Sequence, residues 1–316
     1  TNTLTIILSF AFLPQLFFIL FAYGNIPGLF FMLFAFYHTL CFVREHRTVS
    51  LVLAVVGGCV TVLLRKNFII GVIAIAIYVC LDMLRRFSIK HLILLVSVGI
   101  SLLLPLKLLP AIFIGETSGM PSVLWLAMGT DIDNTVCGPG WYDGSHYYIF
   151  ESSDYDPAAA QEKGVEKLQH NIDKITKDPS AAFRFFVNKT ASQWSDPLYQ
   201  SLWTGPMEEC GQHTHTPLLQ SLYTGGAAET VLSSAMKSFS LAFFGLCLLF
   251  LLRYKASYDG WQMGFLTLIG GFLFHLVWEG KSQYIYPYFF SLMPFAALSL
   301  ARIVTAIQSK IKKTAE

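Results

Sequence analysis

The sequence has few charged residues. Only 13% of its 316 residues are charged, against about 25% in an ordinary soluble domain, while 54% are hydrophobic and the mean hydropathy is +0.54. This balance excludes a water-soluble globule and a disordered chain. The sequence also has only 6 cysteines, spread over its whole length, which excludes a small domain built on disulfides. We therefore expect an integral membrane protein.

Eight apolar stretches are candidates for transmembrane helices, because a bilayer core about 30 Å thick requires about 20 mainly apolar residues. They cover residues 4–23, 27–43, 49–64, 68–84, 91–114, 230–252, 260–278 and 285–304. We therefore expect an all-α integral membrane fold with about eight transmembrane helices. Residues 1–114 would form the first five, residues 115–229 a mostly helical extracytoplasmic domain, and residues 230–316 the last three and a basic cytoplasmic tail.

Lysines and arginines in the short loops predict the orientation of the chain. They follow every second expected helix, at Arg44 and Arg47, at Arg85, Arg86 and Lys90, at Arg253 and Lys255, and at Lys310, Lys312 and Lys313. Because positively charged loops stay on the cytoplasmic side, both ends of the chain are expected to face inward. The polar segment between the fifth and sixth helices is then outside.

This outer segment is acidic: residues 115–228 include 14 acidic residues against 6 basic ones. Apolar residues recur at spacings of 3, 4 and 3 within residues 157–177, which predicts an amphipathic helix. Its apolar face would consist of Val165, Leu168, Ile172 and Ile175. A second helix is predicted from about Ser180 to Trp194, with Phe183, Phe186 and Val187 on one face.

Five basic residues depart from the inward bias, because they lie at the expected outer ends of helices. They are Arg65, Lys66, Lys107, Lys237 and Lys281. Any one of these side chains could simply reach the outer headgroups. Lys107 and Lys237 lie within apolar sequence, however, and are expected to face protein, water or an anion. As a group the five predict a site for an anionic lipid, with an isoprenoid lipid phosphate as the simplest ligand.

The stretch from His275 to Tyr288 combines a cation, a carboxylate, an amide and several aromatic rings. An aromatic belt at the membrane surface would explain its tryptophan and tyrosines. It would not require Glu279, Lys281 and Gln283, which could hold a phosphate or a sugar hydroxyl. The predicted sugar or acceptor site comprises Trp194, Asp196, His275, Glu279, Gln283 and Tyr284. Trp194 could instead pack its short helix on the membrane surface.

Three segments resemble a known family: Leu-Leu-Arg-Lys-Asn at 63–67, Phe-Phe-Val-Asn-Lys-Thr-Ala-Ser-Gln-Trp-Ser-Asp-Pro at 185–197, and Trp-Glu-Gly-Lys-Ser-Gln-Tyr-Ile-Tyr-Pro-Tyr at 278–288. Together they resemble the multi-spanning GT-C type glycosyltransferases of Gram-positive bacteria, similar to the polyprenyl-phosphate-mannose mannosyltransferases. The resemblance covers about residues 40–305. It implies an enzyme of the bacterial cell membrane that moves a sugar from an undecaprenyl-phosphate donor to a cell-envelope glycan or lipid-linked acceptor on the outer face.

Such enzymes resemble one another in placing a catalytic Asp in the first outer loop, whereas the corresponding residues here, 24–27, include no carboxylate. The sequence starts at Thr1 without a basic region before its apolar residues, so we expect a truncated chain rather than a signal peptide. The base is then expected upstream of Thr1. Candidates within the chain are Asp131, Asp133 and Glu279, although the two aspartates could belong to a solvated loop.

Transfer from a lipid phosphate requires a base for the acceptor hydroxyl and cations for the leaving phosphate. Arg65, Lys66 and Lys281 are the candidates for the leaving-group role. A divalent cation is left open as a cofactor, and no metal ligand is assigned.

Cysteine and histidine residues in the outer segment raise two further hypotheses. Cys210, His213 and His215 follow Glu208 and Glu209, but their spacing is not that of a standard zinc site, so a polar loop is the simpler interpretation. Only Cys137 and Cys210 lie outside the expected membrane helices, and a disulfide between them is a hypothesis. Mass spectrometry that finds both thiols free would reject it.

Two other functions compete with the transferase. A transporter or flippase of an anionic lipid-linked glycan would also need cations, but such proteins tend to have paired repeats and charges near the midplane, and neither is evident here. A non-catalytic subunit of envelope assembly is the third. The genomic sequence upstream of Thr1 would separate them, since an outer loop with an Asp would favour the enzyme.

Overall fold

The computed structural model describes residues 2–20, 24–113, 119–134, 138–202 and 216–315. The described residues are almost all helical, and they form no sheet beyond one isolated bridge between Trp141 and Gly280. The all-α class is therefore confirmed. The chain divides into two compact units, which are described separately. Unit 1 comprises Thr1–Leu108, Gln200–Leu268 and Tyr286–Glu316, and unit 2 comprises Leu109–Tyr199 and Ile269–Ile285.

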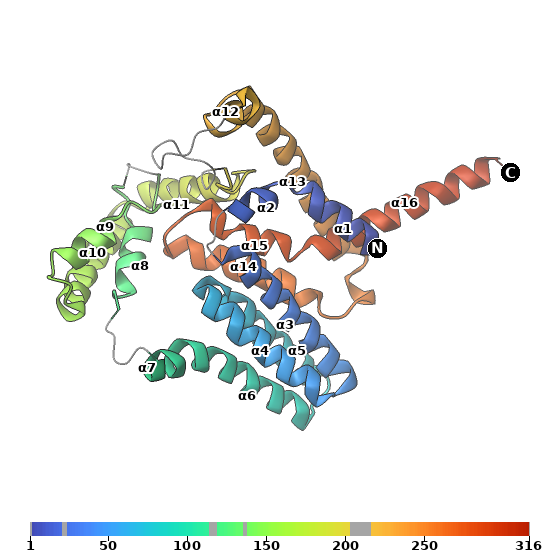
Figure 1. Ribbon diagram of the computed structural model, residues 1–316, viewed down its shortest axis with the longest axis horizontal. Coiled ribbons are helices and arrows are strands. Elements are labelled where there is room, and N and C mark those ends of the chain that lie inside the picture. Colours follow the sequence, from blue (N-terminus) through green and yellow to red (C-terminus); the bar gives the residue numbers. More distant parts are fainter. Residues whose placement is uncertain (1, 21–23, 114–118, 135–137, 203–215, 316) are drawn as a thin grey trace. The chain divides into compact units, whose positions relative to one another are not determined.

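The first helices of unit 1 form a bundle (Figure 1). α3 (Asn25–Glu45) packs on α4 (Thr48–Leu64), while α4 and α5 (Ile69–Arg85) both pack on α6 (Ile89–Leu103). A 3₁₀ turn, η2 (Lys66–Phe68), joins α4 to α5. α6 is followed by a π-helical turn, η3 (Leu104–Leu108), and the next helix in the chain, α7 (Leu109–Phe113), belongs to unit 2. Pro105 lies in this turn, and a wider turn accommodates a residue that has no N–H to donate.

Two further helices of unit 1 pack on α16 (Met293–Ala315). α1 (Asn2–Ala11) and α13 (Ala227–Arg253) contact α16, and α12 (Pro217–Tyr223) contacts α13. The core here is aromatic: the Phe289 ring centroid is 4.0 Å from that of Phe243 and 4.8 Å from that of Phe12. Phe289 belongs to α15 (Tyr286–Phe290), and the short α2 (Pro14–Phe17) follows α1.

Several helices are long and apolar enough to cross a membrane, and they support a membrane-embedded protein. Among the described residues four segments meet this requirement: Asn25–Glu45, Lys66–Arg85, Ile89–Phe113 and Ala227–Arg253. A fifth is added if the bent pair Ser282–Phe290 and Met293–Thr314 forms one span. α1, α4 and α14 (Trp261–Val277) are apolar but shorter. Eight crossings therefore stay a prediction.

The prediction of one continuous helix is wrong for two segments. α1 ends at Ala11, and α2 begins separately at Pro14, so residues 4–23 are not one helix. The predicted helix 285–304 is interrupted after Phe290, and the flanking helical segments are bent by 51°. Both breaks precede a proline, Pro14 or Pro294, whose ring would clash with the carbonyl four residues earlier in an unbroken helix.

Unit 2 contains α8 (Val123–Gly129), α9 (Ser145–Glu151), α10 (Pro157–Lys177) and α11 (Pro179–Trp194). It also contains the end of α14 and a 3₁₀ turn, η6 (Ser282–Tyr284). α10 packs on α8, α9 and α11. The side chains of Asp156 and Asp178 cap the first turns of α10 and α11 by accepting from Ala158 N and Ala181 N, each at 2.9 Å. Both predicted helices are confirmed.

The buried faces of these two helices differ from the prediction. α10 buries Ala160, Gly164 and Asn171, whereas Val165 and Ile172 are 48% and 42% exposed. α11 buries Ala182, Phe185, Lys189 and Gln193, whereas Phe183 is 71% exposed. Small residues allow α8 to approach α10, and the buried polar atoms find partners: Asn171 Nδ2 donates to Ala127 O at 2.7 Å. Leu168 and Ile175 of the predicted face are half-buried, so hydrophobic spacing identified part of the buried side of α10 and missed its small and polar residues.

Candidate functional site

The candidate site lies in unit 2, around residues 278–284 (the 278–284 segment), which follow α14. Gly280 N donates to Gly140 O at 2.8 Å, beside the bridge between Gly280 and Trp141. From α11, Gln193 Nε2 donates to Lys281 O at 3.2 Å. Two different parts of unit 2 therefore hold the 278–284 segment, and these hydrogen bonds fix the position of its backbone.

Two glycines allow the backbones to approach closely around the 278–284 segment. A Cβ on Gly129 would lie 2.3 Å from the carbonyl carbon of Trp278. Gly140 has φ +63°, which L side chains rarely adopt, and a Cβ there would lie 2.5 Å from Gly129 O. Both positions therefore require glycine.

Lys189 of α11 connects these backbones. Its side chain is almost fully buried, with 1% exposure. Lys189 Nζ donates to Gly129 O at 2.5 Å, to Trp278 O at 2.7 Å and to Leu276 O at 3.1 Å. Gly129 and Leu276 lie in the last turns of α8 and α14, where carbonyls lack helical partners and a cation is favoured. Lys189 therefore ties the ends of two helices to α11.

Burial lowers the pKa of Lys189 to about 7, although the negative charge of Glu279 opposes this effect. No role for Lys189 was predicted from the sequence. The signal was its spacing: Phe185, Lys189 and Gln193 recur every fourth residue, so they share one face of α11. A lysine on the same face as a buried Phe is a candidate for a buried ammonium.

Three of the predicted site residues form a buried cluster at the 278–284 segment. Tyr284 Oη donates to Glu279 Oε1 at 2.7 Å, and the Tyr284 ring stacks on the His275 ring with centroids 5.6 Å apart. His275 Nδ1 lies 3.3 Å from Glu279 O. Glu279 and Tyr284 are each 5% exposed, and neighbouring Gln283 is 2% exposed. The structure thus brings these residues together and places the Glu279 carboxylate away from bulk water.

Lys281, in the same segment, contacts an aromatic ring of unit 2. Its ammonium lies 3.9 Å from the ring centroid of Tyr142, which is a cation–π contact, and its side chain is partly exposed. His146 packs on Tyr142, with ring centroids 5.0 Å apart. Burial lowers the pKa of His146, the charge of Lys281 adds to this, and Asp143 opposes it. Tyr142 and His146 were not predicted as site residues.

Asp196 and Trp194 approach the same region from the end of α11. Asp196 Oδ2 accepts from Ser282 Oγ at 2.5 Å, and Asp196 Oδ1 accepts from Leu198 N at 2.9 Å. The Trp194 ring packs on Phe272 of α14, with centroids 5.5 Å apart. Trp194 therefore has a packing partner, while Asp196 is joined to the 278–284 segment.

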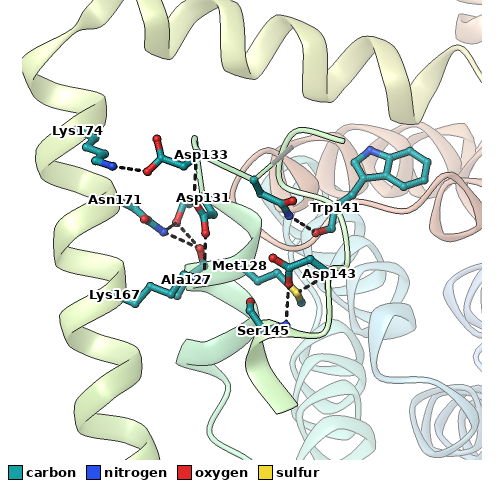
Figure 2. Close-up of polar contacts among 12 residues, drawn as sticks. Ala127, Met128, Asp131, Asp133, Trp141, Asp143, Ser145, Lys167, Asn171 and Lys174 are labelled. Carbon is teal, nitrogen blue, oxygen red and sulfur yellow. Dashed lines mark hydrogen bonds and ion pairs between the residues drawn. The ribbon is translucent and has the colours of Figure 1, made fainter. Parts of the chain in front are cut away.

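Asp131 and Asp133 are engaged by lysines of α10 (Figure 2). Lys167 Nζ lies 2.9 Å from Asp131 Oδ2, and Lys174 forms an ion pair with Asp133. Asp131 Oδ1 also accepts from Asp133 N at 3.1 Å, which closes a turn. The pairs attach the residues after α8 to α10. The arrangement has the features of a structural link, as the solvated-loop interpretation of these aspartates allowed.

The other predicted phosphate-binding residues belong to unit 1. Arg65 follows α4, and its Nη1 donates to Asn25 Oδ1 at the start of α3. Lys66 in η2, Lys107 in η3 and Lys237 in α13 are exposed. Both η2 and η3 pack against α4. A shared phosphate site formed by these residues and Lys281 stays a prediction.

No group of three or more His, Cys, Asp or Glu side chains with the arrangement of a metal site occurs in the part of the chain that the structure describes. The candidate cluster at 208–215, including Cys210, His213 and His215, lies outside the described residues, as does Cys137. The disulfide between Cys137 and Cys210 therefore stays a hypothesis.

Comparison of this chain with protein-family models, with curated proteins and with solved structures found no match.

Proposed function

We propose that the protein is a membrane-embedded glycosyltransferase of the GT-C type. It would transfer a sugar from a polyprenyl-phosphate donor to a cell-envelope glycan or lipid-linked acceptor at the outer face of the bacterial cell membrane. One observation carries the proposal. The 278–284 segment presents a buried carboxylate, Glu279, and a partly exposed cation, Lys281, next to the aromatic rings of Tyr142 and Tyr284. Aromatic rings suit sugar faces, and ammonium groups suit phosphate.

In the proposed reaction, an acceptor hydroxyl oxygen bonds to the anomeric carbon while the bond from that carbon to the phosphate oxygen breaks. Glu279 takes the hydroxyl proton, and the Lys281 ammonium stabilises the charge that develops on the leaving phosphate. The hydrogen bond from Tyr284 Oη orients the Glu279 carboxylate. Among the candidates within the chain, we prefer Glu279 to Asp131 and Asp133 as the base, because both aspartates already form ion pairs with lysines. A single displacement of this kind inverts the anomeric centre.

The proposed topology has eight membrane crossings, with residues 115–229 outside and both ends of the described chain inside. It is supported by the Lys and Arg residues that follow every second apolar helix. α4 and α14, with 17 residues each, are at the lower limit of about 17–25 residues for a spanning helix.

A transporter or flippase of an anionic lipid-linked glycan is the second candidate. The interrupted helices favour it: α1 and α2 are separate, and the segments on either side of residues 291–292 are bent by 51°. Broken helices are typical of transporter binding sites. Movement of a labelled lipid-linked sugar across liposomes, without any transfer of the sugar, would establish this alternative.

The transferase is tested by measuring sugar transfer from a radiolabelled polyprenyl-phosphate sugar in membranes that contain the full chain. Lys281→Met and Glu279→Gln should each lower turnover by about 10²-fold or more, the usual effect of removing charge stabilisation or a general base. Lys177→Met is the matched control, because Lys177 is exposed at the end of α10. Full activity in both site variants would remove these residues from the mechanism.

A further inference from the structure

A second polar cluster lies in unit 1, at the ends of α3, α5 and α6. Asp82 on the last turn of α5 is 9% exposed. Its carboxylate accepts from Arg86 Nε at 3.0 and 2.9 Å, and Oδ2 lies 2.8 Å from His91 Nε2. Asp82 therefore holds a guanidinium group and an imidazole ring in fixed orientations before any ligand binds, which reduces the entropy that binding would otherwise cost.

A cavity of about 330 Å³ lies beside this cluster. Its polar lining consists of Arg44, His46, Arg86, Ser88 and His91, together with two apolar residues. No carboxylate belongs to this lining, which consists entirely of described residues. The lining therefore selects for an anion, and the volume lies near the lower end of the roughly 300–1,000 Å³ usual for small-molecule sites.

The two arginines of this lining have N–H groups that make no hydrogen bond to the described residues. Arg86 uses only Nε for Asp82, and its two terminal nitrogens have no hydrogen-bond partner within the described part of the chain. Arg44 makes one long contact, 3.3 Å from Nη2 to Asp259 Oδ2, and both side chains are more than half exposed. His91 is 4% exposed, and its Nδ1 has no hydrogen-bond partner among the described residues. The terminal N–H groups of the two arginines are what a multivalent oxyanion requires.

Three helix ends meet at this lining. Ser88 caps the start of α6, a helix of 15 residues, and brings the positive end of its dipole, whereas His46 and Arg86 follow the negative ends of α3 and α5, so the arginine side chains supply the attraction for an anion. His46 ends α3 with φ 58°, a left-handed conformation that favours glycine. This conformation is a common way for a helix to end, and it places the His46 side chain at the cavity.

We propose that this cavity binds a phosphate group, as a monoester or diester. The phosphate would be carried by the headgroup of an anionic lipid or by a small soluble molecule. Arg44 and Arg86 would contact its oxygens through paired N–H groups, with His46 and Ser88 as further donors. The proposal does not depend on the transferase, because it uses other residues and stands whether or not sugar transfer is detected.

The experiment measures the unfolding midpoint of the purified full chain, because a ligand that binds only the folded state raises it. One arm titrates inorganic phosphate into protein in nanodiscs of phosphatidylcholine. The other compares nanodiscs of phosphatidylcholine alone with nanodiscs that also contain phosphatidic acid. Arg44→Gln and Arg86→Gln should each weaken the response at least about tenfold, as expected for losing a charged hydrogen bond. Arg85→Gln is the matched control, since Arg85 is exposed at the end of α5, next to Arg86, but does not line the cavity.

A response to phosphate in phosphatidylcholine that depends on Arg44 and Arg86 would support a soluble ligand. A response to phosphatidic acid with the same dependence would support a lipid headgroup. His46→Gly should also weaken binding without lowering the midpoint of the free protein, because glycine relieves the left-handed strain. This variant and Arg44→Gln keep the test valid if Arg86→Gln fails to fold. No response in either arm, or an equal loss in Arg85→Gln, would overturn the proposal.

Discussion

The buried ammonium of Lys189 should make the stability of the protein depend on pH. Burial lowers its pKa from the ordinary 10.5 to about 7. Below pH 7 the amine is protonated in both the folded and the unfolded chain, and the full cost of burying the charge is present. Between pH 7 and 10.5 the unfolded chain binds more protons than the folded chain, so the free energy of unfolding rises with pH.

The expected size of this effect follows from the shift. One pKa unit corresponds to about 1.4 kcal/mol, so raising the pH from 7 to 9 should increase the free energy of unfolding by about 2 kcal/mol. Lys189→Met keeps the length of the side chain and removes the charge, so it should lack this increase. Lys177→Met, at an exposed position, should keep it.

The assay is denaturant unfolding of the full chain in detergent at pH 7, 8 and 9, followed by tryptophan fluorescence. Four of the six tryptophans belong to unit 2, so the signal reports mainly on the unit that contains Lys189. Other titrating groups contribute equally to the wild type and to Lys189→Met, and they cancel in the difference. An identical rise with pH in the two proteins would refute the reasoning.

Three further substitutions test the geometry of unit 2. Gly129→Ala should lower the unfolding midpoint strongly, because its Cβ would meet backbone atoms at 2.3–2.5 Å, whereas Gly99→Ala, with open space around it, should be neutral or slightly stabilising. Asp131→Asn should destabilise the protein by about 1 kcal/mol in denaturant unfolding and leave sugar transfer unchanged, because its ion pair is structural. Tyr284→Phe should lower the turnover of sugar transfer at least about tenfold with little change in the KM for the donor, because Glu279 loses the donor that orients it.

Much of the helical layout could be predicted from the sequence because the signals are local. The expected helices 27–43 and 230–252 correspond to α3 and α13, since a continuous apolar run identifies a membrane helix whatever its neighbours. The start of α11 was recognisable from Asp178 followed by Pro179, where one residue caps the helix and the next has no N–H to satisfy. The breaks before Pro14 and Pro294 were also local signals, but the apolar runs around them concealed these breaks.

The candidate site could be predicted only in part. The stretch 275–288 was recognised because its polar residues interrupt apolar sequence. The role of Lys189 was not recognised, because its three hydrogen-bond acceptors lie 60, 87 and 89 positions away in the chain. The buried polar residues of α10 and α11 were missed for the same reason. Asn171, for example, is buried because Ala127, 44 positions away, accepts its hydrogen bond. Burial of a polar side chain depends on distant partners, which hydrophobic spacing does not report.

Sugar transfer by the full chain tests the central claim most directly. Membranes containing the protein, supplied with a radiolabelled polyprenyl-phosphate sugar and cell-envelope acceptors, should yield a labelled glycan or glycolipid, and Lys281→Met should abolish the product while Lys177→Met retains it. Movement of the labelled lipid across the membrane with no transfer product, or equal product from the wild type and Lys281→Met, would contradict the account.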